Sequence, residues 1–126
     1  MTEVVSKLGE PGTVVVDTRS DRAAFLAGHL RGSLHAPPAK FSDFGGSWLR
    51  PEEDVILVVE GPGEVDGFVR QLARIGFDRV TGAALAGELP SSGPAMVASK
   101  SVSFAGLPAL MTAGRSFHVL DVRRAT

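Results

Sequence analysis

An unbroken aliphatic run, Val55-Ile56-Leu57-Val58-Val59, constrains the fold more than any other part of the sequence. Such a run is typical of a strand that is buried on both faces of a parallel sheet. A glycine-bearing loop follows, and apolar residues then recur at intervals of three and four from Val65 to Ile75, which predicts a helix. Gly76 suits a left-handed cap after that helix. The sequence therefore predicts an α/β domain.

The loop over residues 60–66 lies between the end of the predicted strand and the start of the predicted helix. Free backbone N–H groups and the positive end of the helix dipole meet at such a place, so the loop is a candidate anion site. Gly61 and Gly63 resemble part of a dinucleotide-binding fingerprint, but Asp66 stands where the third small residue is needed. No Lys-Ser or Lys-Thr pair follows that would make a phosphate-binding P-loop.

Charge and composition exclude several classes of function. With 13 basic and 14 acidic side chains the chain shows no electrostatic footprint for nucleic acid or an anionic membrane. We expect a cytoplasmic protein, because the N-terminus lacks signal-peptide features and no apolar run could span a bilayer. Cysteine is absent, which removes disulfides, thiolate metal sites and thiol nucleophiles. We expect no cofactor and no metal.

The remaining sequence alternates between strand and helix patterns. The expected elements are a helix over 2–8, a strand over 13–17, a helix capped by Ser20 and ended by Gly28, a short strand before Pro37, a surface connection with one helical turn over 40–53, a strand over 78–81, a helix over 83–89 and a linker over 90–94. This alternation predicts a parallel sheet with helices on both faces. Trp48, in the surface connection, is either a docking aromatic or a cover for the sheet edge, and we favour the cover.

The C-terminal tail repeats a pattern from the start of the chain. A strand over 101–104, a helix face of Leu107, Leu110 and Met111, and a strand over 117–123 are expected there. The second strand ends in Asp121-Val122-Arg123, as the first ends in Asp17-Thr18-Arg19. We expect one domain over residues 1–94, followed by a linker and the truncated start of a second, similar domain over residues 95–126.

Three segments carry a family resemblance: Val16-Asp17-Thr18-Arg19, Ala27-Gly28-His29-Leu30-Arg31-Gly32-Ser33 and Ile75-Gly76-Phe77-Asp78-Arg79-Val80. Over residues 13–87 the chain resembles a rhodanese homology domain. The resemblance implies a three-layer α/β fold with a central, mostly parallel five-stranded sheet and helices on both faces. It implies structural roles for Asp17, Arg19, Gly28, His29 and Gly32: the Asp17–Arg19 pair ties loops together, and His29 hydrogen-bonds backbone in the Gly28 to Gly32 turn.

Rhodaneses are sulfurtransferases whose active loop typically reads Cys-x-x-Gly-x-Arg-Ser. The matching loop here is Glu60, Gly61, Pro62, Gly63, Glu64, Val65 and Asp66. Glu60 takes the position of the nucleophilic cysteine, Val65 that of the arginine and Asp66 that of the serine. A carboxylate cannot carry sulfane sulfur as a persulfide. The resemblance therefore implies a degenerate loop with no catalytic residue.

Three acidic side chains surround this loop. Two like charges 4 Å apart at an effective dielectric near 20 repel by roughly 4 kcal/mol, so we expect thiosulfate and phosphate to be excluded. We expect Glu60 to accept hydrogen bonds from the free amides of its own loop and to fill the site. The alternative is an enzyme that uses Glu60 as nucleophile or general base on a neutral or cationic substrate, with His29 or His35 as partner.

The expected function is that of a catalytically inactive rhodanese-like module with a structural, binding or regulatory role in a multidomain protein of sulfur metabolism. The resemblance suggests a tandem-rhodanese parent or a fusion with a metallo-β-lactamase-like persulfide dioxygenase, so the full-length parent can still be an enzyme. The expected partners are other domains of the parent, including a second rhodanese-like domain. The tail is expected to dock on its own domain or to form a symmetric dimer.

Overall fold

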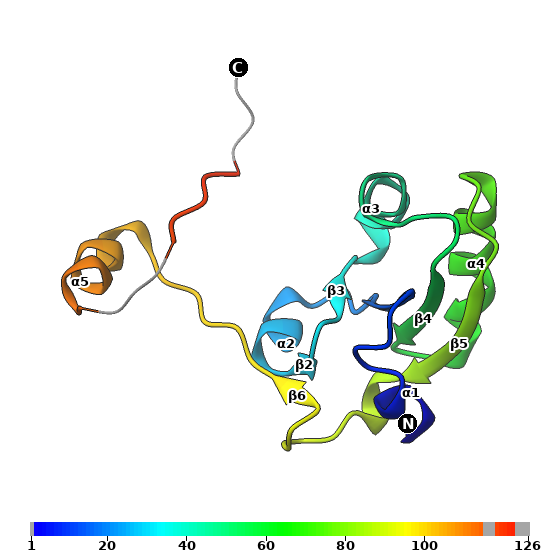
Figure 1. Ribbon diagram of the computed structural model, residues 1–126, viewed down its shortest axis with the longest axis horizontal. Helices are drawn as coiled ribbons and strands as arrows, with labels where there is room; N and C mark the ends of the chain where they lie inside the picture. The colour runs from blue at the N-terminus through cyan, green and yellow to red at the C-terminus, as the bar shows by residue number, and fades with distance from the viewer. Residues whose placement is uncertain (1, 115–117, 123–126) are drawn as a thin grey trace.

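The computed structural model describes residues 2–114 and 118–122, and a four-stranded parallel sheet is its centre (Figure 1). The strand order is β3-β1-β4-β5. The strands are β1 (Thr13–Asp17), β3 (Leu34–His35), β4 (Asp54–Val59) and β5 (Val80–Leu85). All three pairings are parallel, so the carboxyl ends of these strands lie at the same edge of the sheet.

Helices cover both faces of the sheet. They are α1 (Thr2–Ser6), α2 (Arg22–Ala27), α3 (Phe41–Trp48) and α4 (Val65–Arg74), with 3-10 turns at Pro38–Lys40, Pro62–Glu64 and Ala86–Glu88. One core cluster joins the sheet to Phe41 of α3 and to Phe68 and Leu72 of α4. A second cluster joins the opposite face to Val4 of α1. This confirms the predicted α/β class and its layered arrangement.

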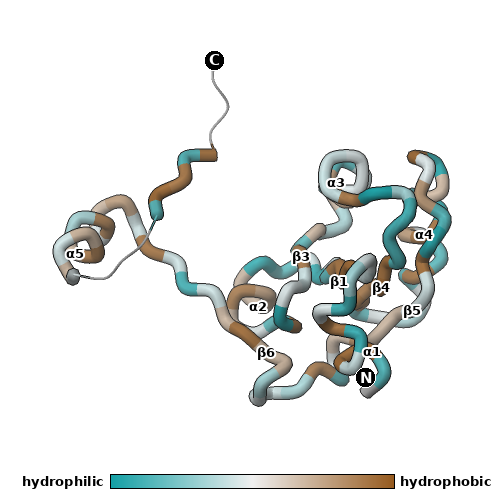
Figure 2. The backbone as a smooth tube through the Cα atoms, viewed as in Figure 1, coloured by the Kyte–Doolittle hydropathy of each residue, from teal (hydrophilic) through white to brown (hydrophobic). Residues whose placement is uncertain are grey.

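Strand β4 is the centre of both clusters. Val55, Leu57 and Val59 belong to the first, whereas Ile56 and Val58 belong to the second. Successive side chains of a strand point to opposite faces, so both faces of β4 are buried at once. Figure 2 shows the hydrophobic colour concentrated on β1 and β4 inside the domain.

The main sheet has four strands in the described residues, one fewer than the predicted five. The residues that follow the Gly28 turn form β2 (His29–Leu30), which pairs antiparallel with β6 (Met96–Val97) in a separate two-stranded sheet. The backbone groups of β2 therefore form their strand hydrogen bonds with β6 and not with the main sheet.

Helix α3 is longer than the sequence analysis predicted, which was a surface connection over residues 40–53 with one helical turn; the helix has eight residues. Its residues Gly45 and Gly46 read as a loop, but Phe41 is only 1% exposed and its ring centroid lies 4.6 Å from that of Phe68. A Cβ at Gly45 would lie 2.9 Å from Ile75 Cδ1 and 3.1 Å from Leu72 Cδ2. Gly45 therefore lets α3 approach α4 closely. Trp48 is exposed and covers no sheet edge, so that prediction was wrong.

The predicted helix over residues 83–89 was also wrong. Strand β5 extends to Leu85, because it pairs with β4 up to the register Val59↔Leu85, and only a 3-10 turn follows. The φ of +95° at Gly76 confirms the predicted left-handed position after α4. No helix in the described part of the chain is long and apolar enough to cross a membrane.

The first folded unit extends past Pro94. The β6 pairing and a 2.9 Å hydrogen bond from Ser99 N to Leu26 O attach residues 96–99 to β2 and α2. Beyond them, the predicted strand over 101–104 is absent, and a 3-10 turn begins at Phe104. The predicted helix is present as α5 (Leu107–Thr112).

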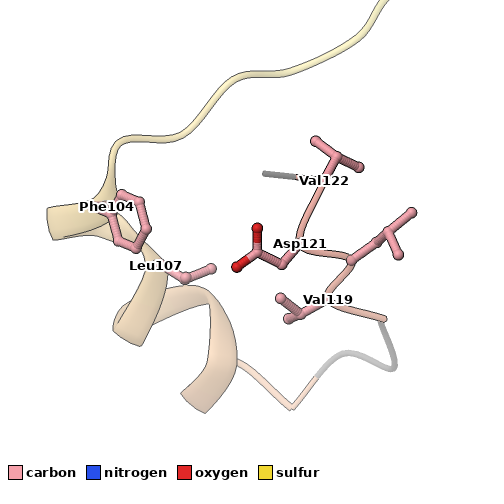
Figure 3. Close-up of a pocket in the computed structure, with 6 residues that line it drawn as sticks. Phe104, Leu107, Val119, Asp121 and Val122 are labelled. Carbon is pink, nitrogen blue, oxygen red and sulfur yellow. The ribbon is translucent and has the colours of Figure 1, made fainter. Parts of the chain in front are cut away.

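The predicted strand over residues 117–123 is not formed in its described part, residues 118–122; Phe117 and Arg123 lie outside the described residues. A strand needs a neighbour for its backbone groups, and none pairs with this segment in the described chain. In Figure 3, Val119 and Asp121 point toward the helix, whereas Leu120 and Val122 are 83% and 82% exposed. Phe104, Leu107, Val119, Leu120, Asp121 and Val122 line a pocket of about 360 Å³ (Figure 3).

Replacing Phe41 tests the contribution of α3 to the core. Phe41→Ala is expected to lower the free energy of unfolding by about 3–5 kcal/mol, because it leaves a cavity between α3 and α4. Phe104→Ala is the matched control, since Phe104 is 86% exposed, and it is expected to change stability by less than about 0.5 kcal/mol. Urea unfolding measures the stability of both variants. A loss for Phe41→Ala that is as small as the loss for Phe104→Ala would show that α3 is not part of the core.

Candidate functional site

The degenerate loop is a short, tightly bonded connection at the carboxyl end of β4. Gly61 is extended, and the 3-10 turn Pro62–Glu64 leads directly into α4. The amide of Glu64 donates to Gly61 O at 3.1 Å, and the amide of Val65 donates to Pro62 O. Two N–H groups that would be free at a simple helix start are therefore satisfied within the turn itself.

Glu60 does not fill its own loop, so that prediction was wrong. The residue is exposed, and within the described chain no hydrogen bond or ion pair reaches its carboxylate. The 3-10 turn supplies the physical reason, because it uses the amides of Glu64 and Val65 that could have bonded the carboxylate. The loop therefore presents a free anionic group to solvent.

The other loop side chains also differ from an anion cradle. Asp66 is exposed and Glu64 is half-buried, so both can add negative charge near Glu60. Val65, at the position of the family's arginine, packs against the core cluster of α3 and α4. The structure thus gives this loop acids at its surface and an aliphatic side chain where a cation would be needed.

Asp17 and Arg19 form a bidentate ion pair at the end of β1. Arg19 Nε lies 3.0 Å and 3.1 Å from the two Asp17 carboxylate oxygens, and Arg19 Nη2 lies 2.8 Å from Oδ2. Arg19 Nη2 also donates to Gly28 O at 2.8 Å. Asp17 is 1% exposed and Arg19 is 11% exposed. The pair therefore joins β1 to the end of α2.

His29 and His35 are both held by backbone carbonyls. His29 Nδ1 lies 2.8 Å from Phe25 O, and His35 Nε2 lies 2.7 Å from Arg19 O. A carbonyl oxygen only accepts, so each of these nitrogens carries a proton. The His29 and His35 rings stack on the Phe25 ring with centroids 3.9 Å and 4.5 Å away. The carbonyl bound by His29 belongs to α2, and not to the Gly28 to Gly32 turn as predicted.

The turn after β2 depends on Gly32, whose φ of +79° is a conformation that L side chains rarely adopt. Ser33 closes the turn, with its amide and its hydroxyl both donating to Leu30 O. Gly28 has an extended backbone, and its amide donates to Ala24 O. The cap of α2 is Asp21, whose carboxylate accepts from Ala23 N, and not the predicted Ser20.

Thr18 is a buried polar residue that sequence reasoning missed. Its backbone N–H and its hydroxyl both donate to Val58 O, at 2.9 Å and 2.7 Å. These bonds join the end of β1 to the end of β4, beside the loop. The sequence feature that could have indicated this buried role is the position of Thr18 between Asp17 and Arg19, just after a buried strand. Within the described chain, no group of three His, Asp or Glu side chains could hold a metal ion.

A family model described as Rhodanese-like domain matches residues 1–82, which is more than half of the chain. The chain is a rhodanese-like domain. The match includes the Asp17–Arg19 pair, the Gly28 to Gly32 turn and the loop at Glu60. A search of curated proteins found no significant match.

Solved structures support the fold. A crystal structure of the Alr3790 protein from Anabaena sp. shares 23% identity and a TM-score of 0.64, over 86% of this chain and 96% of that one. The solution structure of the Rhodanese-like domain of Alr3790 shares 23% identity and a TM-score of 0.60, over 99% of this chain and 91% of that one. A complex of EanB with ergothioneine shares 17% identity and a TM-score of 0.60, over 96% of this chain and 33% of that one.

Removing Arg19 tests the ion pair of this rhodanese-like domain. Arg19→Ala is expected to lower the free energy of unfolding by about 3–5 kcal/mol, because it leaves the buried Asp17 carboxylate without its cation. The control is Arg79→Ala, which breaks the Arg79–Asp54 pair, whose side chains are 52% and 37% exposed. That loss is expected to be about 0–1 kcal/mol. Equal losses in chemical denaturation would contradict a structural role for Asp17–Arg19.

Proposed function

We propose that this rhodanese-like domain is a catalytically inactive binding or regulatory module of a cytoplasmic multidomain protein in sulfur metabolism. One observation carries the proposal: Glu60 stands at the position where the resemblance places the nucleophilic cysteine, in a chain that has no cysteine. Sulfur transfer through a persulfide needs a thiolate that attacks the sulfane sulfur and then carries it. Neither step is open to a carboxylate.

The rest of the loop supports the proposal. An active loop of this kind holds an anion with amides and a cation, whereas here the Glu64 and Val65 amides bond within their own turn. Val65 packs into the core, and the free Glu60 carboxylate is exposed beside Glu64 and Asp66. Substituting cysteine alone would not rebuild such a loop. The loop is therefore specialised away from anionic substrates.

The tail supports a second rhodanese-like unit as the partner. Helix α5 is followed by Gly114 with φ +77° and then by residues 118–122, in the same order as α1, Gly9 with φ +81° and β1. The pocket in Figure 3 lies between Phe104 and Leu107 on one side and residues 119–122 on the other. We propose that residues 104–122 contain the first helix and strand of a second domain, in a tandem or metallo-β-lactamase fusion protein.

The alternative is an enzyme that uses Glu60 as nucleophile or general base on a neutral or cationic substrate. The exposed carboxylate, with no bond to a described residue, meets its first requirement. Such chemistry also needs a proton-transfer partner. The two candidates, His29 and His35, are stacked on Phe25, and each donates one ring N–H to a backbone carbonyl. The inactive module is therefore the better supported function.

A sulfurtransferase assay tests the proposal directly. The unmodified chain is expected to show no transfer of sulfur from thiosulfate to cyanide above the rate in buffer, because it has no thiolate. Glu60→Ala is the control, and its background rate should be the same. Turnover by the unmodified chain that is lost in Glu60→Ala would contradict the proposal and support the Glu60 enzyme.

Alkylation of an introduced thiol tests anion exclusion. For each thiol, the rate with anionic iodoacetate is divided by the rate with neutral iodoacetamide. This ratio is expected to be lower for the thiol of Glu60→Cys than for free cysteine. A carboxylate 4 Å from the anionic reagent repels it by about 1 kcal/mol in water. The variant Glu60→Cys, Glu64→Gln, Asp66→Asn should therefore raise the iodoacetate to iodoacetamide rate ratio by about fivefold or more. An unchanged ratio would show that these acids do not exclude anions.

A further inference from the structure

Strand β5 has an open edge. Its pairing with β4 runs from Val80 to Leu85, and within the described chain no strand pairs with its other side. The outward backbone N–H and C=O groups of such an edge can bond a further strand. Figure 1 shows β5 at the margin of the sheet, near α1.

A groove adjoins this edge because Gly82 has no side chain. Gly82 pairs with Ile56 in register, so a side chain there would lie on the sheet face covered by α1. A Cβ built at Gly82 would come no closer than 4.0 Å to Ile56. The groove has a volume of about 90 Å³ and is lined by Glu3, Val4, Lys7, Ile56, Thr81, Gly82 and Ala83. This space suits one branched aliphatic side chain.

The chain also carries a segment with the pattern of a strand. Residues 98–103 are outside regular secondary structure, and residues 99–103 read Ser-Lys-Ser-Val-Ser. In an extended strand Lys100 and Val102 would share one face, and the serines would share the other. Val102 is 52% exposed, so it can be buried by a partner at little cost to its own fold.

We propose that residues 100–103 of one copy of this chain add as a strand to the β5 edge of a second copy, with Val102 in the groove at Gly82. Backbone hydrogen bonds to β5 supply affinity, and the Val102 side chain fixes the register. If each copy donates its segment to the other, the contact closes into a symmetric dimer. This inference does not depend on the inactivity of the Glu60 loop.

The donor is a second copy because the segment is held away from its own β5. The hydrogen bond from Ser99 N to Leu26 O anchors the start of the segment on α2. Figure 1 shows the chain leaving β6 on the side of the molecule away from β5.

Charge favours one direction of the added strand. Glu3 and Lys7 of the α1 region both line the groove, and Lys100 lies on the same strand face as Val102. Opposite charges attract and like charges repel at these short distances. The orientation that places Lys100 beside Glu3, and away from Lys7, is therefore preferred.

Sedimentation equilibrium over a range of concentrations tests the proposal on the full chain. The unmodified chain should form a dimer. Gly82→Val, which fills the groove, and Val102→Asp, which puts a charge into it, should each weaken the dimer by at least about tenfold, because each removes the one buried side-chain contact. Circular dichroism should show that both variants keep the native fold. A mixture of the two variants has one intact donor and one intact groove, so it should associate more strongly than either variant alone.

Leu120→Asp is the matched control, because Leu120 is 83% exposed in the tail but lies outside the donated segment. It should leave the dimer unchanged. A monomer at all concentrations, dimers of Gly82→Val as stable as those of the unmodified chain, or loss of the dimer in Leu120→Asp would each overturn the proposal.

Discussion

The burial of β4 on both faces is the constraint on which the rest of the structure depends. Its alternate side chains complete two separate clusters, one against α3 and α4 and the other against α1. Such a strand must have a paired neighbour on each side, which β1 and β5 provide. The parallel direction then brings the ends of β1 and β4 to one edge, where Thr18 bonds Val58 O and the Glu60 loop begins.

The loop at that edge differs from an active loop in more than its first residue. The 3-10 turn uses the amides of Glu64 and Val65, the half-buried Val65 side chain packs against the core, and the Glu60 and Asp66 carboxylates are exposed. These features reinforce one another, because two amides that bond within the turn do not point at an oxyanion. The ion pair of Asp17 with Arg19 joins β1 to α2, and within the described chain none of its side-chain hydrogen bonds involves the Glu60 loop.

The sequence was sufficient where a period or a long aliphatic run dominated, as for β1, β4 and α4. It failed for α3, because Gly45, which read as a loop residue, lets the Leu72 and Ile75 side chains approach the helix closely. It also failed for the bonding of Glu60, because the competing use of the loop amides depends on a 3-10 turn that no pattern indicated. The identities of the loop residues were read correctly, but their contacts were set by backbone geometry.

If the Glu60 loop does not hold an oxyanion, sulfite should not bind there. In a nuclear magnetic resonance titration of the isotope-labelled chain, sulfite is expected to cause no saturable shift of the amides of residues 60, 61 and 63–66, with chloride at equal ionic strength as the reference. Saturable shifts centred on Gly61, Gly63 and Glu64 would show a seated oxyanion and would contradict this expectation.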